Sequence, residues 1–293
     1  MSLAPSATRP EKWFNVAGLA ALHTGAVLAL FLHVRPIDVA LVLGLYFLRM
    51  FAITAGYHRY FAHRTYRTGR VFQFLLALVG TLSTQKGPLW WAAMHRRHHR
   101  ESDGPADVHS PVQRGFFYAH LGWVLGGEYE KYDPREVKDL WKYPELRWLD
   151  RFHVVPVVAY IALAAAFGGL RGVLLWYCVS TVAVMHATFA INSIAHVWGT
   201  RPFATKDHSR NNFLLALLTL GEGWHNNHHR YMNSTNQGFY WWQLDVSDLL
   251  LRGLSAARVV SELKRPPKRV LEEGRRRSPT DGGVPVKAAL TAP

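Results

Sequence analysis

The sequence contains a single cysteine among its 293 residues. Cys178 therefore cannot form an internal disulfide, and a metal site built from several cysteines is excluded. Neither an HExxH motif nor a CxxC pair occurs, which weakens a zinc-metalloprotease or thiol-redox interpretation. The chain also lacks a haem or flavin fingerprint, so any electrons that it uses must come from a separate protein.

Acidic residues are scarce as well. Only 20 Asp and Glu stand against 34 Lys and Arg, which gives a formal net charge of +14. This excess favours an anionic partner, such as nucleic acid, anionic lipid headgroups or a phosphate-bearing substrate. Nucleic acid is the weakest of these, because the basic residues flank apolar runs and form no recognition helix. We therefore expect no nucleic-acid partner.

Long apolar runs are what the sequence does contain. Four of them lie at residues 16–34, 39–56, 154–169 and 172–195. Runs of about this length suit transmembrane helices, and the short connections after Val34 and Gly169 are typical of two hairpins. A buried hairpin of a soluble helical protein is the alternative, because His23 and Arg49 interrupt the runs.

The distribution of Lys and Arg indicates the orientation of these spans. Most of them lie near the N-terminus, between residues 57 and 150, and after Trp198. The positive-inside rule places these regions, including both termini and the active site, on the cytoplasmic side. We predict an all-α integral membrane protein with four transmembrane helices in two hairpins and a cytoplasmic helical cap.

This membrane domain is expected to cover residues 1–263 as one unit. The basic, Pro/Gly-rich residues 264–293 are expected to form a disordered tail. Residues 71–82 and 213–220 are too short to span comfortably and are expected to be interfacial or core helices. Residues 246–263 show helical spacing of apolar residues and are expected to lie along the membrane surface.

Histidine is abundant, and nine of the 16 histidines fall into four short clusters. The clusters are HRYFAH (His58, His63), HRRHH (His95, His98, His99), NSIAH (Asn192, His196) and HNNHH (His225, His228, His229). In HRRHH and HNNHH, histidines three and four residues apart share one face of an α-helix and converge. The two histidines of HRYFAH would diverge by roughly 140° on an ideal α-helix, which suits flanking a wider site.

Nine imidazoles exceed what one ion can use, so two metal ions are the economical interpretation. Imidazole binds zinc, copper, iron and nickel, but zinc is disfavoured because its structural sites are tetrahedral with four ligands. Soluble di-iron bundles use repeated Glu-x-x-His motifs, and Glu222–His225 is the only such pair within these clusters. Glu222 is better placed to accept a hydrogen bond from a ligand N–H, and Asp103 and Asp107 are candidates for the same role.

The clusters and their surroundings resemble the three histidine boxes of membrane fatty acyl desaturases, specifically the stearoyl-CoA desaturase-like Δ9 branch. The resemblance lies in ITAGYHRYFAHRTY, QKGPLWWAAMHRRHHRESD, RGFFYAHLGW, NSIAHVWGTRPF and GEGWHNNHH. It covers roughly residues 10–263, and the GEG before the third box and the NSxAH element are its most specific parts.

The resemblance implies an oxidoreductase that uses O2 and two iron ions in the cap to insert a cis double bond, at Δ9, into a saturated long-chain acyl-CoA. It implies nine iron ligands, with Asn192 holding a metal-bound water: His58, His63, His95, His98, His99, His196, His225, His228 and His229. The chemistry agrees with this, since unactivated methylenes offer neither an acidic proton nor an electrophilic carbon. A metal centre that activates dioxygen can oxidise them.

Two departures from the family pattern bear on the acyl carrier. Eukaryotic members that bind acyl-CoA place an Arg-Asp pair before the HRxHH box, where this sequence has Ala93 and Met94. Phe189 stands where those relatives have Trp. An acyl lipid therefore remains an alternative substrate, and Lys86 and Arg114 are candidates to meet its headgroup or a CoA phosphate.

Further expectations concern the tunnel and the partners. Tyr46 and Phe51 are candidates to cap the substrate tunnel. Basic residues at positions 96, 97 and 100 are candidates to dock a separate ferredoxin or cytochrome, and membrane lipids surround the spans. A membrane di-iron hydroxylase is the alternative within the same chemistry. A non-catalytic metal carrier fits less well, because the spans contain few ionisable residues that could form an ion path.

Overall fold

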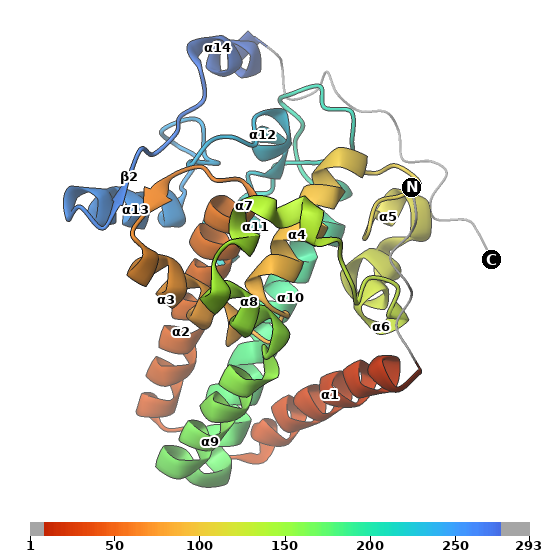
Figure 1. Ribbon diagram of the computed structural model, residues 1–293, viewed down its shortest axis with the longest axis vertical. Coiled ribbons are helices and arrows are strands. Elements are labelled where there is room, and N and C mark those ends of the chain that lie inside the picture. Colours follow the sequence, from red (N-terminus) through yellow and green to blue (C-terminus); the bar gives the residue numbers. More distant parts are fainter. Residues whose placement is uncertain (1–8, 277–293) are drawn as a thin grey trace. The chain divides into compact units, whose positions relative to one another are not determined.

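The computed structural model describes residues 9–276, and most of these residues are helical (Figure 1). They divide into two compact units, which we describe separately. Unit 1 comprises residues 9–62, 70–94 and 124–186, and unit 2 comprises residues 63–69, 95–123 and 187–276. The prediction of a helical chain with apolar helices is confirmed, although the all-α expectation omitted two short strands.

The regular elements of unit 1 are all helices. Its elements are α1 (Arg9–Leu28), η1 (Ala29–Phe31), α2 (Pro36–Phe51), η2 (Ala52–Ala62), α3 (Arg70–Thr81), η4 (Pro134–Val137), α7 (Lys138–Trp141), α8 (Pro144–Arg151), α9 (Val154–Arg171) and η5 (Gly172–Val179). Three helices have residues in both units: α4 (Pro88–Glu101), α6 (Trp123–Gly126) and α10 (Ser180–Ser193). The expected helix at residues 71–82 is α3.

Unit 2 combines short helices with one small sheet. Its elements are β1 (Arg67–Thr68), α5 (Pro111–Arg114), η3 (Tyr118–Gly122), η6 (Ile194–His196), α11 (Phe213–Leu218), α12 (His225–Arg230), α13 (Val246–Ala256), β2 (Val260–Ser261) and α14 (Lys268–Arg276). Strands β1 and β2 pair antiparallel, with Thr68 opposite Val260.

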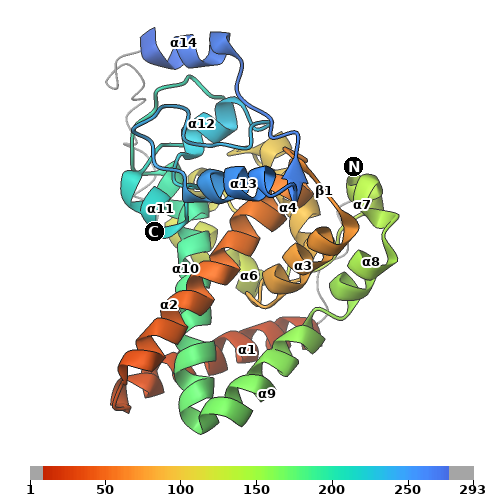
Figure 2. The same ribbon diagram turned by 90° about the vertical axis from the view of Figure 1, so that its left-hand side faces the viewer.

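Three helical stretches are long and apolar enough to cross a membrane: Lys12–Phe31, Pro36–Ala62 and Val154–His196. The last is 43 residues long and covers both of the spans predicted in this region. The backbone leaves the helical conformation inside it at Gly169, where φ is 56°. Glycine adopts this left-handed conformation without the penalty that a side chain brings. Figure 2 shows the chain reversing at the C-terminal end of α9.

A buried carboxylate fixes the start of α2. Pro36 supplies the first helical residue, and Asp38 accepts hydrogen bonds from the backbone N–H and the guanidinium of Arg35. Asp38 also accepts hydrogen bonds from Trp176 in η5 and from Arg171 at the end of α9. Because Asp38 is fully buried, these donors stabilise its charge. They also join the start of α2 to the connection between α9 and η5 within unit 1.

Arg49, which interrupts the second apolar run, faces the interior of unit 1. It is 1% exposed, and its guanidinium donates to the hydroxyls of Ser180 and Thr181 and lies 5.2 Å from the ring centre of Tyr160. A cation in a membrane helix is tolerated where it faces polar groups inside the bundle. The residue is therefore compatible with a spanning helix.

Two expectations about the C-terminal region are wrong in part. The helix expected over residues 246–263 ends at Ala256, and the chain continues into β2. The tail expected to be disordered from residue 264 instead contains α14, because Val270 packs against Phe203 and Tyr240 in a buried apolar cluster. The rest of that predicted tail, residues 277–293, lies outside the described residues.

Candidate metal centre

The histidines of α4 divide between two groups of imidazoles. His95 and His99 point the same way, and their Nε2 atoms are 2.9 Å apart. His98, one residue before His99, is directed to a different set of histidines. On an α-helix, residues four apart differ by about 40° around the axis, whereas residues three apart differ by about 60° in the opposite sense. The expected convergence of all three histidines is therefore correct only for the pair four residues apart.

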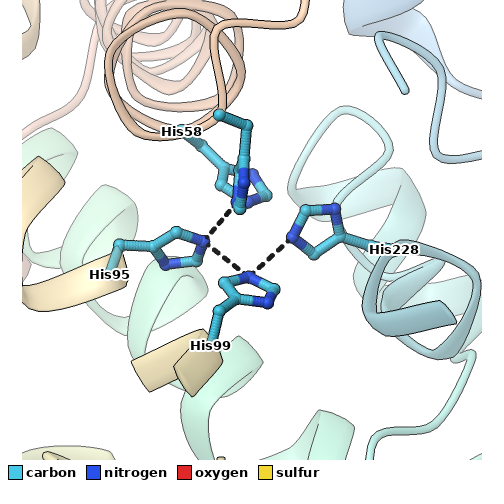
Figure 3. A group of neighbouring side chains, drawn as sticks. His58, His95, His99 and His228 are labelled. Atoms are coloured by element: carbon cyan, nitrogen blue, oxygen red, sulfur yellow. Dashed lines mark hydrogen bonds between the residues drawn. The ribbon is translucent and has the colours of Figure 1, made fainter. Parts of the chain in front are cut away.

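The first group within unit 2 consists of His63, His95, His99 and His228. The Nε2 atoms of His63 and His95 are 2.9 Å apart, and those of His99 and His228 are also 2.9 Å apart. Figure 3 shows His95 and His99 reaching from α4 and His228 reaching from α12, with their ring nitrogens directed toward one another. Four imidazoles from separate parts of the sequence thus converge on one point.

The second group consists of His98, His196, His225 and His229. Its ligand nitrogens all lie within 4.8 Å of one another, and the Nε2 atoms of His196 and His225 are 3.0 Å apart. Among the described residues, Nε2 of His98 and Nε2 of His229 are buried without a hydrogen-bond partner. A buried polar atom without a partner is costly, so these nitrogens are suited to an ion.

Three carboxylates lie behind the second group. The Nδ1 atoms of His98, His196 and His229 donate to Asp107 at 2.8 Å, to Asp103 at 3.0 Å and to Asp207 at 2.6 Å, respectively. Each hydrogen bond fixes the tautomer that leaves the Nε2 lone pair free to bind a metal. Carboxylates in this position also make the imidazole a stronger ligand.

The charges of this site are strongly perturbed. Burial alone would raise the pKa of Asp103, but the charge and hydrogen bond of His196 lower it well below its usual range. Burial lowers the pKa of His229 to about 4, although Asp207 opposes the change. Burial and neighbouring histidines also lower the pKa of His99 and of His225. These imidazoles are therefore neutral at pH 7, which is the form that binds a metal.

The spacing of the nitrogens fits ligands around an ion. With metal–nitrogen distances of about 2.1 Å, neighbouring ligands lie about 3.0 Å apart in an octahedral shell and about 3.4 Å apart in a tetrahedral one. The four nitrogen pairs above are separated by 2.9–3.0 Å. The donor set can therefore accommodate an ion in each group.

The HNNHH cluster is positioned by amides. Helix α12 has only six residues, and its Asn226 and Asn227 are fully buried. Asn211 accepts hydrogen bonds from the backbone N–H of both and donates its own amide to the side chain of Asn227 at 2.7 Å. This network stabilises a helix that is too short to be stable through its own hydrogen bonds.

The other predicted site residues occupy different elements. His58 is in unit 1, buried in η2, with its ring centre 6.0 Å from that of Trp91. Asn192 is half-buried near the end of α10, four residues before His196. Glu222 is buried, and its carboxylate accepts a hydrogen bond from Gln237 at 2.8 Å.

The candidate substrate residues occupy distinct environments. Lys86 is in unit 1 and pairs with Glu130 at 2.6 Å. Arg114 is exposed in unit 2, with its guanidinium 3.6 Å from the ring centre of Tyr118. Both tunnel candidates, at positions 46 and 51, are half-buried, at residues of α2.

Sequence reasoning missed Asp207 and the amide network. Asp207 is the only carboxylate between His196 and Glu222, so its position between two histidine clusters could have marked it as a candidate hydrogen-bond acceptor. His109, expected to be an ordinary solvated, interfacial or core histidine, is buried beside His98 and Asp107, with its possible ligand atom within 4.8 Å of theirs. No sequence pattern marks Asn211.

Apolar helices long enough to cross a membrane, together with histidine groups able to hold metal ions, are the features of a membrane protein with a metal centre. Comparison with known proteins identifies the family: residues 35–253 match the family model for fatty acid desaturase. The chain belongs to the fatty acid desaturase family, as its histidine boxes led us to expect. It is an oxidoreductase that acts on fatty acyl substrates.

Curated relatives differ in their substrates. A probable chloroplastic lipid desaturase of Arabidopsis thaliana is 39% identical over 76% of this chain, and the match covers 62% of that relative's length. A hex-5-enoyl-acyl-carrier-protein acetylenase of Moorena producens is 33% identical over 88% of this chain and 87% of its own. An sn-2 palmitoyl-lipid 9-desaturase of Nostoc is 32% identical over 85% and 90%, respectively.

Proposed function

We propose that this protein is a di-iron desaturase that inserts a cis double bond at Δ9 of a saturated long-chain acyl group. The reaction removes two hydrogens from adjacent methylenes and, with two electrons and two protons from outside, reduces O2 to two molecules of water. The convergence of eight histidine side chains of unit 2 into two groups is the observation that supports this proposal most strongly. The name of the Nostoc relative supports the Δ9 position.

One iron would be held by each histidine group. His63, His95, His99 and His228 would hold the first, and His98, His196, His225 and His229 the second. Iron suits imidazole ligands and, unlike zinc, changes its oxidation state, so the pair would supply the one-electron chemistry that O2 activation needs. All other contributions come from the protein itself.

Two further ligands complete the proposed set. His58 precedes His63 by five residues at the end of a π-helix. The i→i+5 hydrogen bonds of a π-helix bring residues five apart toward the same side, which removes the divergence expected on an α-helix. Asn192 would hold a metal-bound water, since it lies four residues before His196. Glu222 would support the HNNHH cluster through its hydrogen bond with Gln237.

The carboxylates have the role of positioning the ligands. Asp103, Asp107 and Asp207 keep the protons of three histidines on Nδ1, and therefore hold the Nε2 atoms ready to bind. Their negative charges also offset the positive charge that two bound irons would bring into a buried site.

We also propose a membrane topology with four spans. The stretch Val154–His196 would cross the membrane twice, because Gly169 interrupts it. Positive-inside reasoning would place both termini and the histidines on the cytoplasmic side, as parts of one functional domain. Tyr46 and Phe51 on α2 are then candidates to end the acyl tunnel, and the basic residues Arg96, Arg97 and Arg100 are candidates to dock an acidic electron donor of the ferredoxin or cytochrome type.

Product analysis tests the proposed reaction. The chain is expressed in a host that makes no unsaturated fatty acids, and the position of new double bonds is determined by mass spectrometry. We expect a Δ9 alkene, loss of product in His228→Ala with the protein still in the membrane fraction, and full product in His33→Ala, whose side chain is exposed and outside the clusters. An alcohol as the main product would indicate a hydroxylase and contradict the proposal, as would activity in His228→Ala.

A further inference from the structure

Unit 1 contains a cavity of about 530 Å3, lined by both polar and apolar side chains, that the proposed reaction does not use. It lies at the N-terminal end of α4, the helix that also carries three of the histidines. Cavities of this size commonly bind small molecules or headgroups. The residues that matter for its chemistry are Lys86, Trp90, Glu130, Tyr132, Asp150 and His153.

The positive charge in this cavity is neutralised. Lys86 is the only Lys or Arg among the described residues that line it, and its ammonium lies 2.6 Å from the carboxylate of Glu130. The side chains of Lys86 and Glu130 are only 22% and 12% exposed, so water screens the pair weakly. Glu130 also accepts a hydrogen bond from the amide of Asn15, which holds its carboxylate in place.

A second carboxylate in the cavity has no positively charged partner of this kind. Asp150 accepts hydrogen bonds from the backbone N–H of Leu89 and Trp90 at the start of α4, and from the hydroxyl of Tyr132 at 2.6 Å. Burial lowers the pKa of His153, which is therefore neutral at pH 7. The cavity thus has no net positive charge.

We propose that this cavity binds the uncharged, hydroxyl-rich headgroup of an acyl lipid. This inference rests on the proposed desaturase function and specifies its acyl carrier. Hydroxyl groups can exchange hydrogen bonds with the carboxylate of Glu130 and the remaining donors of Lys86. The rings of Trp90 and Phe14 offer apolar surface to the C–H groups of a sugar or glycerol.

A polyanionic carrier fits this surface poorly. The phosphates of CoA would approach Glu130 and Asp150 with no unpaired cation in the cavity to offset them. Position 93, where acyl-CoA relatives have Arg, is a fully buried alanine, and Met94 beside it is 5% exposed. Arg114, the other candidate for a phosphate contact, interacts with Tyr118 in unit 2.

The test compares acyl donors that carry the same stearoyl chains. Membranes containing the full chain receive reduced ferredoxin and one of three donors: distearoyl monogalactosyl-diacylglycerol, distearoyl phosphatidylglycerol or stearoyl-CoA. Each lipid is offered in vesicles of otherwise identical composition, so the two differ only in their headgroup. A carboxylate without a paired cation repels a phosphate about 6 Å away. At a dielectric constant between those of water and a protein surface, this repulsion weakens binding of the anionic donor about tenfold. We expect kcat/KM for the galactolipid to exceed that for each anionic donor by about this factor.

A charge-removing variant tests the role of the cavity itself. Lys86 and Asn15 donate to different oxygens of Glu130. Glu130→Gln removes the charge and keeps one accepting oxygen, and we expect it to shift the kcat/KM ratio of stearoyl-CoA over galactolipid about tenfold toward CoA. Glu128→Gln, an exposed residue outside the cavity, should leave the ratio unchanged.

Equal use of phosphatidylglycerol and galactolipid, preference for stearoyl-CoA, or an unshifted ratio in Glu130→Gln would overturn the headgroup inference while leaving the desaturase function intact. Absence of an alkene from every donor would instead overturn the proposed function, and this inference with it.

Discussion

Removing the charge of Asp207 should weaken metal binding without breaking the local fold. Asp207 accepts a hydrogen bond from Nδ1 of His229 at 2.6 Å and others from the backbone and hydroxyl of Ser209. His229 and Ser209 donate to different oxygens of this carboxylate, so Asp207→Asn keeps one accepting oxygen, which can serve His229, and loses the negative charge. Carboxylates behind metal-binding histidines are worth about 10–100-fold in metal affinity, or about 1.4–2.7 kcal/mol.

We expect Asp207→Asn to lose about tenfold in iron affinity and Asp207→Ala, which also loses the hydrogen bond, to approach 100-fold. The assay is the loss of iron from purified protein to a competing chelator, followed together with the rate of product formation. Glu262→Gln is the control, because this exposed residue forms only a surface ion pair with Arg67. An Asp207→Ala protein that is folded and retains iron as firmly as the unmodified chain would refute the reasoning.

Three other predictions concern stability. Gly169→Val should cost about 1–3 kcal/mol because valine is strained at φ 56°, and the thermal midpoint should fall further than in Gly44→Val, where nothing lies within 4 Å of the new Cβ. The free energy of unfolding of the iron-free protein should fall by about 3 kcal/mol between pH 6.5 and pH 4 from His229 alone. Burial holds the pKa of His229 at about 4 in the folded chain, so the unfolded chain takes up the proton first. His229→Gln should flatten this pH dependence in thermal unfolding, and an unchanged slope would contradict the prediction. Gly274→Val should displace α14, since a Cβ there would lie 2.4 Å from a tyrosine hydroxyl, and limited proteolysis should cut α14 faster than in the open-site variant Gly253→Ala.

The histidines of the two groups could be singled out from the sequence because they are concentrated in short motifs. Histidines spaced three and four residues apart define a helix face, and periodicity alone identifies His95 and His99 as a convergent pair. Periodicity gives only an angle around the helix axis, however. It could not show that His98 contributes to the group of His196, His225 and His229, because that depends on which distant segments pack nearby.

Carboxylates near a motif were easier to predict than distant ones. Asp103 and Asp107 follow HRRHH within eight residues, and both accept hydrogen bonds from histidines as expected. Asp207 precedes His229 by 22 residues, and no local spacing connects the two. Only tertiary packing brings them together, so a search limited to neighbouring positions could not find this contact.

Composition misled the interpretation of the C-terminal segment. Its prolines, glycines and arginines are typical of disorder, yet residues 268–276 form the nine-residue helix α14. Val270 and Gly274 are four residues apart on the buried side, and Arg230 forms an ion pair with Glu273. A helix this short has too few apolar positions for its periodicity to be recognised.

The metal content of the purified protein tests the central claim most directly. Elemental analysis with Mössbauer spectroscopy should find two iron ions per chain in six- or five-coordinate nitrogen-rich sites, and substitution of His228 or of His225 should each reduce that number. A chain that binds a single ion, or that holds tetrahedral zinc in preference to iron, would contradict the assignment of the two histidine groups to a di-iron centre.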